Sequence, residues 1–203
     1  MLYGLRTYVD NAAIEPRIMR FEDTWIVRDA RTEFFRLAVL PSDGGYSARF
    51  IRFRIGIFCF ALPNSPARKK AVPLHDLHHL ATGYDTSWTG EAEIAAWELA
   101  SGCFSYRAAW LLNLLAFPLG LMIAPVRTWR AFLRGRSSGS LYDGRWDDKW
   151  LDASLGSLRA HLALDVDSRP PNGGDVLLFV VCALPALFGL VALILGVIRM
   201  WPR

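Results

Sequence analysis

Three of the four histidines lie in one short stretch, residues 73–98, together with several carboxylates. If the first part of this stretch is helical, successive side chains rotate by about 100°, so His75, Asp76 and His79 share one face. Two imidazoles at positions i and i+4 can bind the same metal ion. Asp76 either completes the coordination or orients a histidine by accepting its second N–H. His78 falls on the other side of His75, where we expect it to be exposed or to contact a substrate.

The carboxylates that would complete such a site follow a turn containing glycine and polar residues. We expect a second helix to begin near Thr89, with Glu91 in its first turn and Glu98 seven residues later on nearly the same face. An antiparallel helix pair would bring one or both carboxylates over the histidines. This nitrogen and oxygen set suits one divalent ion of zinc, iron, manganese or cobalt. Plainer roles stay open: a helix-capping acid for Glu91, an exposed side chain for Glu98 and ordinary polar histidines.

The spacing also resembles a family signature. His75-Asp76-x-x-His79, eleven residues and then Glu91 is similar to the H-D-x-x-H-(x11)-E signature of the Coq-four family of ubiquinone (coenzyme Q) biosynthesis proteins. The similarity extends over about residues 73–164, through Thr82-Gly83, Gly90-Glu91, Trp97-Glu98, Gly102, Ala124-Pro125-Val126-Arg127, Leu155, Leu158 and Arg159. Residues 1–70 and the apolar C-terminal segment do not share it.

The resemblance implies a mostly helical, membrane-associated protein that binds one divalent metal ion through His75, Asp76, His79 and Glu91. It implies action on the head group of a polyprenylated hydroxybenzoate, whose C1 carboxyl is replaced by hydroxyl in an oxidative decarboxylation, or organisation of other ubiquinone-biosynthesis proteins. Asp76 and Glu98 are then the candidate catalytic residues, with Glu98 a proton shuttle if burial raises its pKa. The alternatives are a non-catalytic lipid-binding scaffold and another metal-dependent enzyme such as a hydrolase.

The C-terminal segment Val176–Ile198 contains no charged residue. As a helix it would extend about 34 Å, enough to cross a hydrocarbon core of about 30 Å. We therefore predict a transmembrane helix, which Pro185 kinks or divides into a re-entrant hairpin. The alternative is a long helix buried in the core.

A second apolar run, residues 108–126, precedes arginines at positions 127, 130, 134 and 136. It could be a span, a helix at the lipid surface or a buried helix, and Asn113, Pro118 and Gly120 disfavour the span. No nucleic-acid recognition motif accompanies the arginines, so we expect no nucleic-acid partner. The expected partners are a polyprenylated aromatic lipid, the membrane and other pathway proteins, and homo-oligomerisation is left open.

Composition sets the outer limits of the fold. The chain has 203 residues, a net charge of +4 and three cysteines too scattered for a disulfide framework or a thiolate zinc site. The first twenty residues carry no evident targeting signal. We therefore expect the catalytic region on the cytoplasmic face of a membrane, the inner membrane if the source is bacterial.

We predict a mainly α fold built on a metal-binding helix pair. Residues 24–29 and 48–62 fit either strand or helix, and residues 151–162 form an amphipathic helix with four spaced leucines. The predicted parts are an N-terminal region of uncertain structure (1–70), a helical metal-binding core (71–164), a linker (165–175) and a C-terminal membrane anchor (176–203).

Overall fold

The computed structural model describes residues 21–55, 58–164 and 170–200, and its fold is mainly helical, as predicted. The absence of a targeting signal was expected for residues 1–20, which lie outside the described residues. The elements in chain order are α1 (Val27–Leu37), β1 (Phe50–Ile55), β2 (Phe58–Pro63), α2 (Pro66–Thr82), α3 (Trp88–Ser101), α4 (Arg107–Ile123), α5 (Pro125–Arg136), the 3-10 helices η2 (Leu141–Asp143) and η3 (Asp148–Asp152), α6 (Leu155–His161) and α7 (Gly173–Met200).

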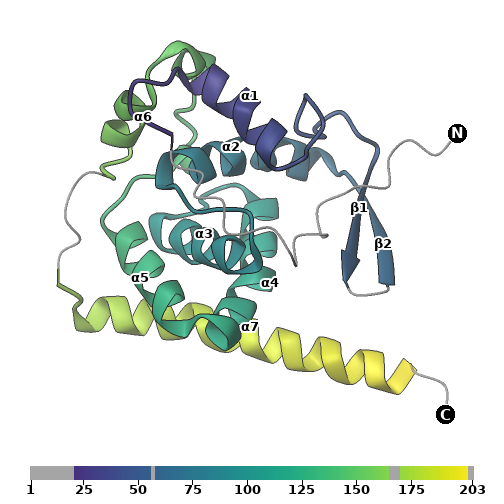
Figure 1. Cartoon of the computed structure of the whole chain (residues 1–203). Coiled ribbons are helices and arrows are strands. Elements are labelled where there is room, and N and C mark those ends of the chain that lie inside the picture. Colours follow the sequence, from purple (N-terminus) through teal and green to yellow (C-terminus); the bar gives the residue numbers. More distant parts are fainter. Residues whose placement is uncertain (1–20, 56–57, 165–169, 201–203) are drawn as a thin grey trace, which may run out of the picture.

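Helix α3 forms the centre of the bundle and packs most extensively against α4 and α5 (Figure 1). Small residues allow these helices to approach closely. A Cβ on Gly135 of α5 would overlap the carbonyl oxygen of Trp97, and one on Gly120 of α4 would lie 2.7 Å from the Cβ of Ala92. Glycine is therefore required at both crossings, because any side chain would push the backbones apart.

Helices α1, α2 and α6 lie on the side of the bundle opposite α7 (Figure 1). The four leucines predicted to share an apolar face, Leu151, Leu155, Leu158 and Leu162, are all buried. The regular helix α6 is shorter than the predicted one. Ser154 accepts a hydrogen bond from the backbone N–H of Ser157 at 3.1 Å, and such an N-cap begins a new helix after η3.

The two regions that the sequence left undecided adopt different structures. Residues 50–55 and 58–63 form a pair of antiparallel strands whose register runs from Phe50 paired with Pro63 to Ile55 paired with Phe58. It projects from the helices beyond the first turn of α2 (Figure 1). Residues 24–29 instead lead into α1 after a single β-bridge between Ile26 and Ser154.

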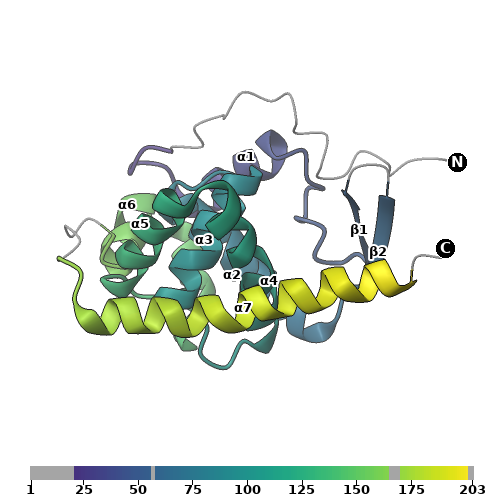
Figure 2. The ribbon, with the colours of Figure 1, turned by 90° about the horizontal axis from the view of Figure 1, so that it is seen from below.

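Helix α7 runs along the outside of the bundle and continues beyond the other helices (Figure 2). Its first half packs against α4 and α5. Phe179 contacts the rings of Phe117, Trp129 and Phe132 with centroid distances of 5.3, 4.8 and 5.0 Å. Farther along, Cys182, Ala183 and Ala186 are buried. This part of the segment therefore belongs to the core of the bundle.

Two expectations about the C-terminal segment are corrected by this arrangement. The helix continues through Pro185 without reversing, so it is not a re-entrant hairpin. A proline keeps a helical φ and removes one backbone donor, and here the flanking turns stay helical. Across the described residues, no helix combines the length and apolarity needed to span a bilayer.

The predicted linker is also shorter than expected. Residues 165–169 lie outside the described residues, and Gly173–Asp175 already belong to α7. The carboxylate of Asp175 pairs with Arg136 of α5 at 3.0 Å and accepts the backbone N–H of Asn172 at 3.0 Å. These contacts fasten the beginning of α7 to the bundle, which a free linker would not do.

Candidate metal centre

The two histidines of the predicted motif lie in the last turns of α2. Gly83 ends this helix in the left-handed conformation (φ 77°), and its N–H donates to the carbonyl of His79 at 2.9 Å. Other backbone carbonyls in the last turn of α2, which have no partner within the helix, accept hydrogen bonds from arginines of distant helices. Arg134 donates to Thr82 at 2.8 Å, and Arg159 donates to Ala81 at 3.0 Å. The end of α2 is therefore fixed by α5 and α6.

A short turn then places Glu91 opposite the histidines. The hydroxyl of Ser87 accepts the N–H of Gly90 at 3.1 Å and starts α3, so that Glu91 falls in its first turn, as predicted. Only glycine fits at position 90, because a Cβ there would overlap the carbonyl oxygen of Asp85. The turn is thus tight enough to return the chain to the histidine face.

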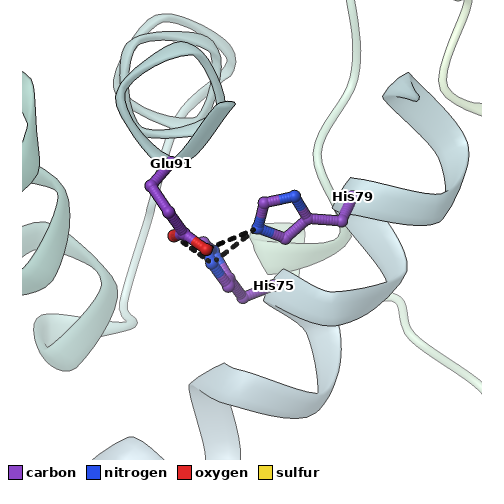
Figure 3. Close-up of side chains that lie close together, drawn as sticks. All are labelled: His75, His79 and Glu91. Atoms are coloured by element: carbon purple, nitrogen blue, oxygen red, sulfur yellow. Dashed lines mark hydrogen bonds and ion pairs between the residues drawn. The ribbon is translucent and has the colours of Figure 1, made fainter. Parts of the chain in front are cut away.

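The structure brings His75, His79 and Glu91 together (Figure 3). The Nε2 atoms of the two histidines are 3.1 Å apart. The carboxylate oxygens of Glu91 lie 3.6 Å from His75 Nε2 and 3.7 Å from His79 Nε2. With metal–nitrogen bonds of about 2.0–2.1 Å, two imidazoles on one tetrahedral or octahedral ion would be about 2.9–3.4 Å apart. The observed nitrogen separation fits that range.

The second ring nitrogen of each histidine is already engaged. His75 Nδ1 lies 2.9 Å from Glu98 Oε1, and His79 Nδ1 lies 2.9 Å from the carbonyl of Tyr84. Both partners are acceptors, so each Nδ1 carries a proton and each neutral ring presents an Nε2 lone pair to the other. Two lone pairs at this distance repel unless a proton or a metal ion lies between them.

The charges around the site favour one positive charge between the imidazoles. Burial alone would lower the pKa of His75, but the carboxylates of Glu98 and Glu91 outweigh it and raise this pKa well above its ordinary value. Burial lowers the pKa of His79, and Glu91 offsets this only in part. The site therefore attracts a single cation, either a proton on His75 or a metal ion.

Asp76 occupies a different position from the one expected of a ligand. Its carboxylate accepts a hydrogen bond from the hydroxyl of Tyr46 at 2.6 Å and is not part of the group formed by the two histidines and Glu91. Burial raises the pKa of Asp76 to about 6, against the opposing effects of His75 and Tyr46. Tyr46 comes from the loop before β1, which the sequence pattern did not associate with the motif.

The structure corrects the exposure expected of His78 and the condition set for Glu98. His78 was expected to be exposed or to contact a substrate, and Glu98 to act as a proton shuttle if burial raised its pKa, with an exposed side chain as the plainer alternative; neither side chain has exposed surface. Burial alone would raise the pKa of Glu98, as a proton shuttle requires, but His75 and His78 outweigh burial and lower it. Glu98 is therefore held as a carboxylate. The spacing did offer one indication that His78 lies close to His75, since residues i and i+3 of a helix are neighbours.

Comparisons of the whole chain with protein-family models, with curated proteins and with solved structures found no match.

Proposed function

We propose that this chain binds one divalent metal ion through His75, His79 and Glu91. The observation that supports it is the pair of Nε2 atoms 3.1 Å apart, each on a ring whose Nδ1 donates to a fixed acceptor. Two imidazoles and a carboxylate form a donor set suited to zinc, iron, manganese or cobalt. Asp76 remains a candidate second-sphere residue, held by Tyr46 next to His75.

Three protein ligands leave at least one coordination position open, which is typical of catalytic rather than structural sites. The side chains of His75 and Glu91 are 22% and 21% exposed, while that of His79 is 1% exposed. A substrate would therefore approach from the side of His75 and Glu91. When bound, the ion supplies Lewis-acid polarisation of a substrate oxygen.

The substrate class that we propose is a polyprenylated hydroxybenzoate, with replacement of its C1 carboxyl by hydroxyl. The support for this class is the resemblance of residues 73–98 to the Coq-four signature. The reaction is a two-electron oxidation, in which the acid and one water give the phenol, carbon dioxide, two protons and two electrons. The electrons require an external acceptor such as dioxygen.

We further propose that the chain works at a membrane, with the bundle on the cytoplasmic face. Residues 107–136 contain no acidic residue but several arginines. The same region carries several exposed apolar side chains. Large apolar side chains that are at least half exposed there and on α7 are Leu111, Leu115, Met122, Val126, Val176, Leu177, Val181, Leu184, Phe188, Val191 and Leu195. An apolar surface bordered by cations suits contact with anionic lipid.

Metal content tests the site directly. Elemental analysis of the purified full-length chain should give about one divalent ion per chain, and His79→Ala should reduce it to background. The matched control is His161→Ala, because the His161 ring packs at a tilt against Trp150, and this substitution removes a histidine that lies outside the cluster. Equal metal content in the wild type and His79→Ala would refute the assignment.

The exposed apolar surface of α4 and α7 also favours a second candidate, a non-catalytic lipid-binding scaffold for other ubiquinone-biosynthesis proteins. Metabolite profiling of a deletion strain separates the two. An enzyme predicts accumulation of the carboxylated precursor and failure of Glu91→Ala to restore the pathway. A scaffold predicts restoration by Glu91→Ala.

A further inference from the structure

A buried carboxylate lies directly behind the proposed metal centre. Glu98 of α3 has no exposed surface and receives hydrogen bonds from three other elements. His75, His78 and Tyr142 donate to Oε1 at 2.9, 2.6 and 3.2 Å, and Asn113 donates to Oε2 at 2.6 Å. A carboxylate oxygen has about two lone-pair sites, so the three donors occupy Oε1 completely, while Oε2 accepts one hydrogen bond. Glu98 Oε1, the oxygen that faces His75, therefore has no lone pair left for a metal ion.

The backbone of η2 decides which nitrogen of His78 carries the proton. The N–H of Leu141 points at His78 Nε2 at 3.0 Å, and a backbone N–H can only donate. Nε2 must then be the acceptor and Nδ1 the protonated nitrogen. His78 Nδ1–H in turn donates to Glu98 Oε1. The directions of both hydrogen bonds of the His78 ring therefore follow from one backbone amide.

The same carboxylate fixes the orientation of His75. Because Glu98 Oε1 accepts the Nδ1–H of His75, the Nε2 lone pair of that ring is directed at His79 and Glu91. A ring rotation of 180° about its axis would break this hydrogen bond and turn a carbon toward the site. The position of Glu98 is thus coupled to the availability of His75 as a ligand.

We propose that Glu98 and His78 are positioning residues of the metal centre. In this arrangement, Leu141 N–H sets the tautomer of His78, His78 together with Asn113 holds the carboxylate of Glu98, and Glu98 holds His75 in the ligating orientation. The role of these residues rests on the proposed function, because it concerns affinity for the ion bound by His75. Partners of this kind typically change metal affinity by about 10–100-fold.

Core packing alone does not account for this arrangement. A buried charge is unfavourable unless it is paired, and an apolar side chain of similar size would fill the same volume without that cost. His78 also makes edge contacts with Trp97 and Tyr142, each with ring centroids 4.9 Å apart, which an apolar side chain could replace. What an apolar residue cannot replace is the donated proton.

Metal titration of the full-length chain tests the proposal with two matched variants. His78→Leu keeps the volume but removes the donor, and we expect it to weaken Co²⁺ and Zn²⁺ binding by about 10–100-fold and to shift the visible absorption bands of bound Co²⁺. His78→Asn places an amide N–H near the position of Nδ1, and we expect it to restore affinity to within about threefold of the wild type. His161→Ala serves as the control for the loss of a histidine.

A second measurement does not depend on the stability of any variant. Ring nitrogen chemical shifts of the wild-type chain should show His78 neutral with the proton on Nδ1, the tautomer less common in water. A proton on Nε2, or an affinity and Co²⁺ spectrum of His78→Leu equal to those of the wild type, would overturn the positioning role while leaving the metal site intact. Absence of metal binding by the wild type would instead overturn the proposed function and the positioning role together.

Discussion

Phe179→Ala tests whether α7 is part of the bundle or an independent anchor. The Phe179 ring makes edge contacts with Phe117, Trp129 and Phe132 at centroid distances of 4.8–5.3 Å. Such aromatic pairs contribute about 0.5–1.5 kcal/mol each beyond area burial, and removal of a core phenylalanine costs about 3–5 kcal/mol. Because Phe179 is only partly buried, we expect the free energy of unfolding to fall by about 2–4 kcal/mol.

The assay is chemical or thermal unfolding of the full-length chain in one fixed mild detergent. For a chain of this size each kcal/mol lowers Tm by about 2–4 °C. Phe188→Ala is the matched control, since Phe188 belongs to the same helix but is 71% exposed, and we expect its effect to stay within about 0.5 kcal/mol. If both variants unfold like the wild type, α7 contributes nothing to the bundle and its docking is refuted.

Three further predictions concern the packing and the metal centre. Gly135→Ala should destabilise the chain by about 1–3 kcal/mol in the same unfolding assay, because the new methyl meets the backbone of Trp97, whereas Gly173→Ala has open space and should be nearly neutral. Arg159→Ala uncaps the end of α2 and should lower both Tm and metal content, and unchanged values would contradict the capping role. Zn²⁺ at about 100 times its Kd should stabilise the wild type by about 2.7 kcal/mol but leave the Tm of His79→Ala unchanged.

The sequence predicted the part of the site that depends on local spacing. His75 and His79 lie one helical turn apart, and Glu91 begins the next helix, so the tight return through Gly83 and Gly90 was enough to bring them together. Helical periodicity gives the angle of a side chain around its own helix. It does not say which sides of the helix other elements cover.

The residues that were placed wrongly depend on distant segments. His78 is buried because η2 covers it from more than sixty residues away in sequence, through the backbone of Leu141. Asp76 meets Tyr46 from a loop thirty residues earlier. Neither Leu141 nor Tyr46 belongs to a local pattern that includes the histidines, so the burial of His78 and the partner of Asp76 could not be derived from spacing alone.

The prediction of a transmembrane helix differs from the structure for another reason. Hydropathy summed along residues 176–198 treats every apolar side chain alike, although the side chains of a helix point in different directions. Phe179, Cys182, Ala183 and Ala186 recur at intervals of three and four residues, the spacing of one helix face, and these residues contact the bundle. The stripe was present in the sequence but was hidden by the uniformly apolar composition around it.

The capping of α2 by late segments has a consequence for biosynthesis. The three proposed ligands have all been translated once residue 91 is made. Leu141, which fixes the tautomer of His78, and Arg159, which caps the C-terminal end of α2, are translated much later. A nascent chain that ends between residues 91 and 141 would contain the three ligands but lack the residues that orient His78 and cap α2. Acquisition of the metal ion is therefore expected to follow, rather than guide, the folding of the chain on the ribosome.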